Sequence, residues 1–431
     1  MKKVLIIAYY WPPTGGAGVQ RWLKFVKYLP EFGWEPIVYT PSNPESPAID
    51  EGLLKDIREG TRVIRRPIWE PYQLYRIFTR KGEDEKVSSG FASEVESNKT
   101  REYIANFIRS NFFIPDARRF WIRPSIRHLS KYLKENPVDA IVSTGPPHSM
   151  HLIALGLKKR LGVKWVADFR DPWTNIDYID ELKLTGIARR KHQRLEKKVL
   201  QNADQRIIVG KVWGKELEAL GDREVNVITN GYDSDDLEGQ EVPLDKHFSI
   251  AHIGILNKHR NPLALWKALE ELCEESEEFR EDLRIVLIGK ADLEVTKAIE
   301  KHGLEKQLEK PGYLAHEEAI RYQQKSQVLL LAINNSPNAK GILTGKVFEY
   351  MASRRPMIVI GPTDGEIARV MSETGAGLVS DFDDSVLLKE HVRSYYKEYK
   401  NDRLEANSQD VEKYSRRELT RSLSKVLNRT Q

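Results

Sequence analysis

Short runs of consecutive apolar residues alternate along the chain with longer stretches in which apolar residues recur at every third or fourth position. Such runs predict buried β-strands, and the recurring spacing predicts amphipathic helices. In the first half, the predicted strands are 4–9, 36–39, 138–142, 164–167, 206–209 and 225–229. In the second half, they are 248–253, 283–288, 328–333, 357–360 and 377–379. This alternation predicts an α/β protein with doubly wound, Rossmann-like parallel sheets.

The length of the chain, 431 residues, exceeds what a single hydrophobic core usually supports, so we predict two domains. The first covers residues 1–235 and the second covers 245–405. The residues between them follow an Asn-Gly turn and are rich in glycine and acidic side chains, as a linker would be. Apolar residues at helical spacing predict one more helix within 410–431, which either packs on a domain or stays in solvent.

Residues 65–134 interrupt the alternation, and we predict that they form an irregular insertion in the first domain. Basic and aromatic residues are interleaved there, as in Tyr72, Tyr75, Arg76, Phe78, Phe112, Phe113, Arg118, Arg119, Phe120, Trp121 and Arg123. Three interpretations stay open: an insertion that packs its rings into the domain, a surface that contacts a membrane or a lipid-linked acceptor, and a platform for single-stranded nucleic acid. The polar part, 83–100, predicts a mobile loop.

The charge and the cysteine content of the chain argue against a nucleic-acid-binding protein and against a disulfide-rich protein. The 68 Lys and Arg residues nearly balance the 63 Asp and Glu residues, and the net charge of +5 is not typical of a nucleic-acid-binding protein. The single cysteine, Cys273, excludes a disulfide framework and favours a reducing compartment. No apolar run reaches the roughly 18 residues of a membrane-spanning helix, and the first run ends in Pro12-Pro13 without a signal-peptide cleavage site. We therefore expect a cytoplasmic protein that is soluble or lies on the inner face of the cell membrane.

A glycine loop, residues 14–18 (TGGAG), follows the first predicted strand and precedes a helix, which is how a nucleotide-binding unit begins. Dinucleotide-binding proteins place an acidic residue at the end of the next strand to hold a ribose. Here that strand ends in Thr40-Pro41, which argues against a nicotinamide cofactor. Gly15 and Gly16 either form only a tight turn or let the backbone approach a ligand.

A second glycine loop, in the second domain, predicts an anion site. Gly341, Thr344 and Gly345 precede a helix that begins near Lys346, and a helix N-terminus presents unpaired N–H groups and a partial positive charge. Lys346 is unfavourable there unless an anion offsets it. Glu349, one turn further, would accept hydrogen bonds from sugar or ribose hydroxyls. The alternative is a core helix with an ordinary solvated lysine and glutamate.

The loop after the first strand of the second domain also carries cations in front of a helix. It begins at Gly254 and contains Lys258 and Arg260. Two cations at a helix N-terminus again indicate an anion. The sequence does not decide between Lys258 and Arg260.

Two loops of the first domain follow predicted strands, residues 143–149 (STGPPHS) and 167–173 (ADFRDPW). Ligands of parallel sheets bind outside the carboxyl ends of the strands. His148 and Asp171 are therefore candidates to position a hydroxyl group of a ligand or to take its proton. The alternative is that His148 caps a helix and Asp171 belongs to a turn.

We predict no metal site. His148 and His151 have the spacing of two zinc ligands on one helix face, but no third ligand with motif spacing follows. The acidic string 233–236 (DSDD) resembles an aspartate cluster that binds a metal ion, but it lies in the predicted linker.

Residues 346–352 (KVFEYMA) followed by 356–361 (PMIVIG) resemble the donor-binding segment of GT-B glycosyltransferases of family 4. The loops 143–149 and 167–173 are similar to acceptor-side motifs of many bacterial sugar transferases of this class. The resemblance implies two Rossmann-like domains that face each other across a cleft, with the last helix crossing back onto the first. It also implies an enzyme that transfers a sugar from a nucleotide-diphosphate donor to the hydroxyl of a glycan or a lipid-linked acceptor. We expect retention of configuration and a place in the synthesis of bacterial surface glycans.

The resemblance also suggests roles for single residues. Glu349 would hold the nucleotide ribose, and Gly312 and Tyr313 would border the base. The diphosphate would lie near Gly15, Gly16, Gly254, Thr344, Lys346 and either Lys258 or Arg260. These cations would make a metal or cofactor unnecessary.

The chain departs from the family pattern at two positions. Gly341 stands where many members carry the first of two glutamates eight residues apart, and Ile255 replaces the arginine that usually follows the glycine. Two other functions stay open: a nucleotide-sugar epimerase or hydrolase of the same fold, and a non-catalytic protein that binds membrane or RNA.

Overall fold

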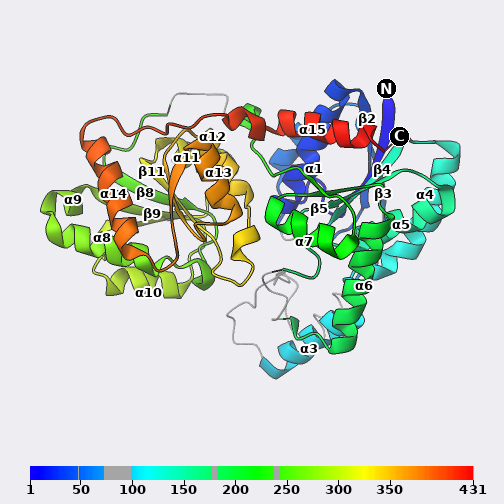
Figure 1. The fold of residues 1–431 in the computed structure, drawn as a ribbon, viewed down its shortest axis with the longest axis horizontal. Helices are drawn as coiled ribbons and strands as arrows, with labels where there is room; N and C mark the ends of the chain where they lie inside the picture. The colour runs from blue at the N-terminus through cyan, green and yellow to red at the C-terminus, as the bar shows by residue number, and fades with distance from the viewer. Residues whose placement is uncertain (47, 72–98, 177–181, 237–241, 431) are drawn as a thin grey trace. The chain divides into compact units, whose positions relative to one another are not determined.

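The structure is a computed structural model, and it describes residues 1–46, 48–71, 99–176, 182–236 and 242–430 (Figure 1). The chain forms two compact units. Unit 1 comprises residues 1–229 and 416–431, and unit 2 comprises residues 230–415. The fold prediction is confirmed, because each unit is built on one parallel sheet with helices between its strands.

Unit 1 is built on a seven-stranded sheet with the order β3-β2-β1-β4-β5-β6-β7. Every pairing between neighbouring strands is parallel. The strands are β1 Lys2–Ile7, β2 Trp34–Pro41, β3 Arg62–Arg66, β4 Ala140–Gly145, β5 Trp165–Phe169, β6 Gln205–Ile208 and β7 Asn226–Val227. Because the chain order reverses between β1 and β4, the loops that follow these two strands flank the position where such sheets bind ligands.

The helices of unit 1 cover this sheet (Figure 1). They are α1 Ala17–Tyr28, α3 Lys99–Phe112, α4 Arg119–Glu135, α5 Ser149–Leu161, α6 Gly186–Asn202, α7 Lys211–Gly221 and α15 Arg416–Asn428. Helix α15 packs against α1 although nearly 400 residues of chain separate them. Leu423 and Leu427 of α15 share one core cluster with Trp22 and Val26 of α1.

The interrupted segment 65–134 is more regular than we predicted, because α3 and α4 lie within it. Helix α4 buries Trp121, Ser125, Leu129 and Leu133, which are spaced four residues apart, and it packs against α5. The ring of Trp121 stacks on Tyr39 with centroids 4.8 Å apart. The arginines between these positions obscured the helical spacing. Residues 83–98 of the predicted mobile loop lie outside the described residues, and its last two residues begin α3.

Unit 2 is built on a six-stranded parallel sheet with the order β10-β9-β8-β11-β12-β13. The strands are β8 Phe248–Ile253, β9 Leu283–Ile288, β10 Leu308–Gly312, β11 Val328–Ala332, β12 Met357–Ile360 and β13 Gly377–Ser380. The helices are α8 Leu263–Glu275, α9 Glu277–Asp282, α10 Leu293–Lys301, α11 His316–Lys325, α12 Gly345–Ala352, α13 Glu366–Thr374 and α14 Ser385–Lys400.

Alternate residues of the central strands of unit 2 enter two different cores. Ile250 of β8 and Leu330 of β11 pack with α8 and α14, whereas Ala251 and Leu329 pack with α12 and α13. A strand that is buried on both faces needs apolar residues at consecutive positions. This is why the unbroken apolar runs in the sequence located the strands.

Asp168 of β5 joins three elements of unit 1 below the carboxyl edge of the sheet. It is fully buried, and it accepts two hydrogen bonds from Arg21, at 3.1 and 3.0 Å. Trp22 Nε1 and Thr144 Oγ1 also donate to it, at 2.6 and 3.1 Å. The four donors and the paired charge compensate for the burial of a carboxylate.

Removing this charge tests whether it stabilises unit 1. In Asp168→Asn the Arg21 guanidinium stays buried without its counter-charge, which costs about 3–5 kcal/mol. We expect the melting temperature to fall by about 10 °C, measured by circular dichroism. The control is Asp222→Asn, because Asp222 is exposed at the end of α7. Equal melting temperatures for the two variants would contradict a stabilising role.

Candidate active site

Three glycines lie at the carboxyl edge of the unit 2 sheet, at the ends of three neighbouring strands. Gly254 follows β8, Gly289 follows β9 and Gly312 ends β10, and their φ angles are 122°, 101° and 85°. Positive φ angles favour glycine over other residues. A Cβ atom on Gly289 would lie 2.6 Å from the carbonyl oxygen of Gly254. Glycine is therefore required for the close approach of these two loops.

The side chain of Lys346, in the first turn of α12, lies over Gly254. A Cβ atom on Gly254 would lie only 1.9 Å from Lys346 Nζ. Burial and the nearby charge of Arg260 lower the pKa of Lys346 to about 8, against the opposing effect of Glu349. A lysine kept partly out of water beside a second cation is poised to bind an anion.

Arg260, rather than Lys258, is the second cation at this position. Both belong to the short helix η5 Lys258–Arg260, but Lys258 is exposed, whereas Arg260 is half-buried and its charge acts on Lys346. Arg260 Nε donates a hydrogen bond of 2.7 Å to Asn334 Oδ1. Of the two residues, Arg260 is thus the one whose charge acts on Lys346.

The N-terminus of α12 adds further donors to the two cations. Thr344 is the N-cap residue, but its side chain makes no capping bond. Its hydroxyl is buried and has no hydrogen-bond partner within the described ranges. The first turn of α12 contains no acidic residue. Glu349, one turn further along, is exposed.

Two buried polar residues that the sequence analysis did not single out hold this arrangement. The Tyr350 hydroxyl accepts a hydrogen bond from the backbone N–H of Ile253 at 2.9 Å, which fastens α12 to the end of β8. His252 Nδ1 donates to the carbonyl oxygen of Leu330 at 3.1 Å and so links β8 to β11. Burial, with the charges of Lys346 and Arg260, lowers the pKa of His252 to about 3, so His252 is neutral. A buried hydroxyl or imidazole needs a hydrogen-bond partner. The two polar residues at apolar positions of a predicted strand and helix were therefore the signal in the sequence that could have identified them.

Gly312 and Tyr313 lie at the end of β10, which is separated from β8 by β9. The backbone N–H of Gly289 donates to the carbonyl oxygen of Gly312 at 2.8 Å. Tyr313 is almost fully exposed. The two residues therefore belong to the same edge of the sheet as Gly254.

Two histidines lie at the carboxyl edge of the unit 1 sheet. His148 precedes α5 and His151 lies in its first turn, and both rings are buried. A Cβ atom on Gly145 would lie 2.9 Å from His148 Nδ1 and 2.7 Å from His151 Nε2. Neither of these nitrogens has a hydrogen-bond partner within the residues that the structure describes.

Both histidines are uncharged at neutral pH. Burial lowers the pKa of His148 well below its usual value, and it lowers the pKa of His151 to about 3. His151 Nδ1 lies 2.8 Å from Ser143 Oγ, whereas the ring of His148 stacks flat on Trp173 with centroids 4.6 Å apart. A neutral His148 can accept or donate a hydrogen bond but is a weak base.

The segment that contains Asp171 is held by α6. Trp173 Nε1 donates to His192 Nδ1, and the backbone N–H of Trp173 donates to Glu196 Oε1, both at 2.9 Å. Asp171 itself is half-buried. This position is compatible both with Asp171 as part of a turn and with Asp171 as a reactive group.

The insertion supports the neighbouring helix. Asp116 accepts hydrogen bonds from the backbone N–H and the hydroxyl of Ser149, at 2.8 and 2.7 Å. It thereby caps α5 from another part of the chain. The position of His148 at the start of α5 thus depends on the insertion.

The first glycine loop contacts an arginine that we did not predict. Gly16 is the N-cap of α1 with φ 98°, and the backbone N–H of Gly15 donates to the carbonyl oxygen of Ala48 at 2.9 Å. A Cβ atom on Gly18 would lie 2.8 Å from Arg170 Nη1. Arg170 Nη2 donates to the carbonyl oxygen of Pro146 at 2.9 Å. The guanidinium therefore connects the glycine loop to the loop before α5.

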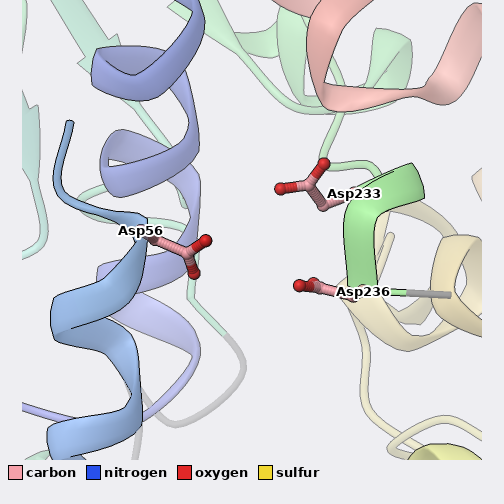
Figure 2. A group of neighbouring side chains, drawn as sticks. All are labelled: Asp56, Asp233 and Asp236. Carbon is pink, nitrogen blue, oxygen red and sulfur yellow. The ribbon is translucent and has the colours of Figure 1, made fainter. Parts of the chain in front are cut away.

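The acidic string 233–236 contributes two carboxylates, Asp233 and Asp236, which Figure 2 draws with the carboxylate of Asp56. Asp56 belongs to unit 1, whereas Asp233 and Asp236 belong to unit 2. Taken singly, neither unit assembles three possible metal ligands among its described residues.

Two family models match the chain. The model of glycosyl transferases group 1 matches residues 233–412, and the model of glycosyltransferase family 4 matches residues 85–236. The chain belongs to glycosyltransferase family 4. It is therefore an enzyme that transfers a sugar from a nucleotide-sugar donor, and the first match covers the unit that contains Lys346.

Solved structures show that this family 4 enzyme has the GT-B fold. A glycosyltransferase from Rickettsia africae matches with a TM-score of 0.63 and 11% identity, over 100% of this chain and 98% of that one. Anabaena Alr3699/HepE, solved in complex with UDP and glucose, matches with a TM-score of 0.62 and 12% identity, over 99% of this chain and 100% of that one. The lipopolysaccharide outer core galactosyltransferase WaaB matches with 0.59 and 13%, over 100% of both chains. A search of curated proteins gave no match.

The lowered pKa of Lys346 predicts how pH affects the binding of nucleoside diphosphates by this glycosyltransferase. A lysine attracts a diphosphate only when it is protonated, so affinity at a site that uses Lys346 should be full well below pH 8 and should decline as pH rises through the pKa. We expect binding about tenfold weaker at pH 9 than at pH 7, measured by calorimetry. Lys346→Arg keeps its charge over this range and should show no such decline. A parallel decline in the variant would exclude Lys346 as the titrating group.

Proposed function

We propose that this enzyme transfers a sugar from a nucleotide-diphosphate donor, with the diphosphate bound between Lys346, Arg260 and the N-terminus of α12. One observation carries the proposal. The Lys346 ammonium lies over a bare glycine and near a second cation, on the helix whose N-cap residue, Thr344, has a buried hydroxyl with no partner among the described residues. Two cations this close repel each other, and an anion bound between them would relieve that repulsion.

The same groups would assist the reaction. Negative charge accumulates on the diphosphate as its bond to the sugar breaks, and preorganised cations and N–H groups stabilise that charge. We propose that they take the role that a divalent metal has in other transferases, so that the reaction needs neither metal nor cofactor. Lys346 is positioned for this without reorganisation, because Tyr350 holds α12 against β8.

The remaining donor contacts follow from the edge of the unit 2 sheet. We propose that Glu349, exposed one turn after Lys346, accepts hydrogen bonds from the ribose hydroxyls. The backbone at Gly254 would approach the diphosphate, and Gly312 and Tyr313 would border the base. Lys258, exposed beside Arg260, would interact with the outer part of the donor.

The acceptor would bind at the carboxyl edge of the unit 1 sheet. We propose that the neutral ring of His148 orients the acceptor hydroxyl, because its Nδ1 is buried with no partner among the described residues. Asp171 on the next loop would take part, and the Gly15-Gly16 backbone would approach the donor diphosphate or the acceptor. Retention of configuration, a glycan or lipid-linked acceptor, and a place in bacterial surface-glycan synthesis in the cytoplasm complete the proposal.

A screen of nucleoside diphosphates and their sugars tests the donor site. We expect one nucleotide series to raise the melting temperature, because ligand that binds only the folded state stabilises it. Glu349→Ala should weaken that binding about 10- to 100-fold, the loss of one or two hydrogen bonds to a charged group. The control is Glu300→Ala, at an exposed position of α10.

The outcomes also separate the competing functions. A labelled donor incubated without acceptor should stay largely unchanged. Rapid formation of an epimer would indicate an epimerase instead of a transferase, and rapid release of free sugar would indicate a hydrolase. No stabilisation by any nucleotide, together with salt-sensitive binding of RNA, would favour a non-catalytic protein.

Substitution of His148 tests the acceptor site. His148→Ala should lower turnover more than tenfold and leave donor affinity within twofold, because the donor residues belong to unit 2. His148→Phe retains a ring against Trp173 but has no ring nitrogen, so it should be equally slow. Normal turnover in His148→Phe would show that the ring only packs.

A further inference from the structure

Helix α3 exposes a row of large apolar side chains. Ile104, Ile108 and Phe112 are 41%, 42% and 64% exposed. Residues four apart lie on the same side of a helix, so the three side chains form one stripe. Single exposed apolar residues are common, but a continuous row indicates a binding surface.

The stripe continues onto the start of α4. Arg119 Nη1 donates a hydrogen bond of 2.5 Å to the carbonyl oxygen of Phe112, which places Phe120 next to the end of α3. Phe120 and Trp69 pack edge to face with centroids 4.9 Å apart, and they are 44% and 57% exposed. We call these five residues, Ile104, Ile108, Phe112, Phe120 and Trp69, the apolar stripe.

Helix α6 places a strongly positive face next to the apolar stripe. It packs against α3 (Figure 1), and the backbone N–H of Thr185 donates to Asn111 Oδ1 at 2.7 Å. Its one acidic residue, Glu196, is buried, where it binds Trp173 and Thr174. The exposed cations of α6, which we call the basic face, are Arg189, Arg190, Lys191, Arg194, Lys197 and Lys198.

We propose that the apolar stripe and the basic face bind the surface of an anionic lipid bilayer. Apolar side chains beside cations suit this environment, because the former enter the boundary of the acyl chains while the latter meet anionic headgroups. A second copy of the chain fits less well, since a symmetric contact would bring two basic faces together. No helix in the described parts of the chain is long and apolar enough to cross a membrane, so binding would be peripheral.

Sedimentation of the full chain with lipid vesicles tests this surface. We expect it to bind vesicles of phosphatidylcholine with 30% phosphatidylglycerol at least tenfold more strongly than vesicles of phosphatidylcholine alone. Binding should weaken severalfold in 0.5 M NaCl, because salt screens the attraction to headgroups. The double variant Ile108→Glu/Phe112→Glu should lose binding. The matched control is Leu293→Glu/Val386→Glu, which places the same two charges on exposed apolar positions of α10 and α14.

A second pair of variants tests the basic face. Arg190→Ala/Arg194→Ala should reduce binding to anionic vesicles at least fivefold. Lys297→Ala/Lys301→Ala removes the same charge from exposed positions of α10 and should have no effect. Nucleotide affinity, which depends on unit 2, should be unchanged in every variant and so separates this proposal from that of the donor site.

Three results would overturn the proposal. The first is equal binding to neutral and anionic vesicles. The second is an equal loss of binding in the variants and in their controls. The third is that the apolar-stripe variants differ from the unmodified protein in molar mass, measured by light scattering, but bind vesicles equally well. The last would make the stripe an interface between copies. If the double glutamate variant does not fold, Phe112→Ser, a milder change, takes its place, and unchanged vesicle binding in a folded Phe112→Ser would also count against the proposal.

Discussion

The placement of one ammonium group over a bare backbone is the constraint on which the proposed donor site depends. Lys346 can lie over residue 254 only because that residue has no side chain, and Gly289 must be equally bare for the loop to adopt its path. Tyr350, one turn along the same helix, is hydrogen-bonded to Ile253, the last residue of β8 and the neighbour of Gly254. The sheet edge, helix α12 and Lys346 are therefore coupled, and a change to any one of them would displace the charge of Lys346.

The two sheets could be predicted from the sequence because strands buried on both faces leave unbroken apolar runs. The candidate anion loops were also visible, since glycines and cations before a helix are a local pattern. What the sequence could not decide was the choice between Lys258 and Arg260. They are two residues apart, and only the path of the short helix determines which of them reaches Lys346.

Contacts between distant parts of the chain account for what was missed. Arg170 meets the glycine loop across about 150 residues of sequence, and Asp116 caps a helix that begins 33 residues later. Neither contact leaves a local pattern. Helix α4 was missed for another reason. Arginines between its buried positions obscured the helical spacing of the apolar residues, so the segment was predicted to be an irregular insertion.

The return of α15 to unit 1 has a consequence for the order in which the enzyme matures. Residues 230–415 contain all of unit 2, whereas the core of unit 1 includes Leu423 and Leu427. During synthesis, the lobe that begins first is thus the last to close its core, and unit 2 can complete its fold while unit 1 still waits for its final helix. Until that helix emerges, the apolar face of α1 that α15 covers stays exposed.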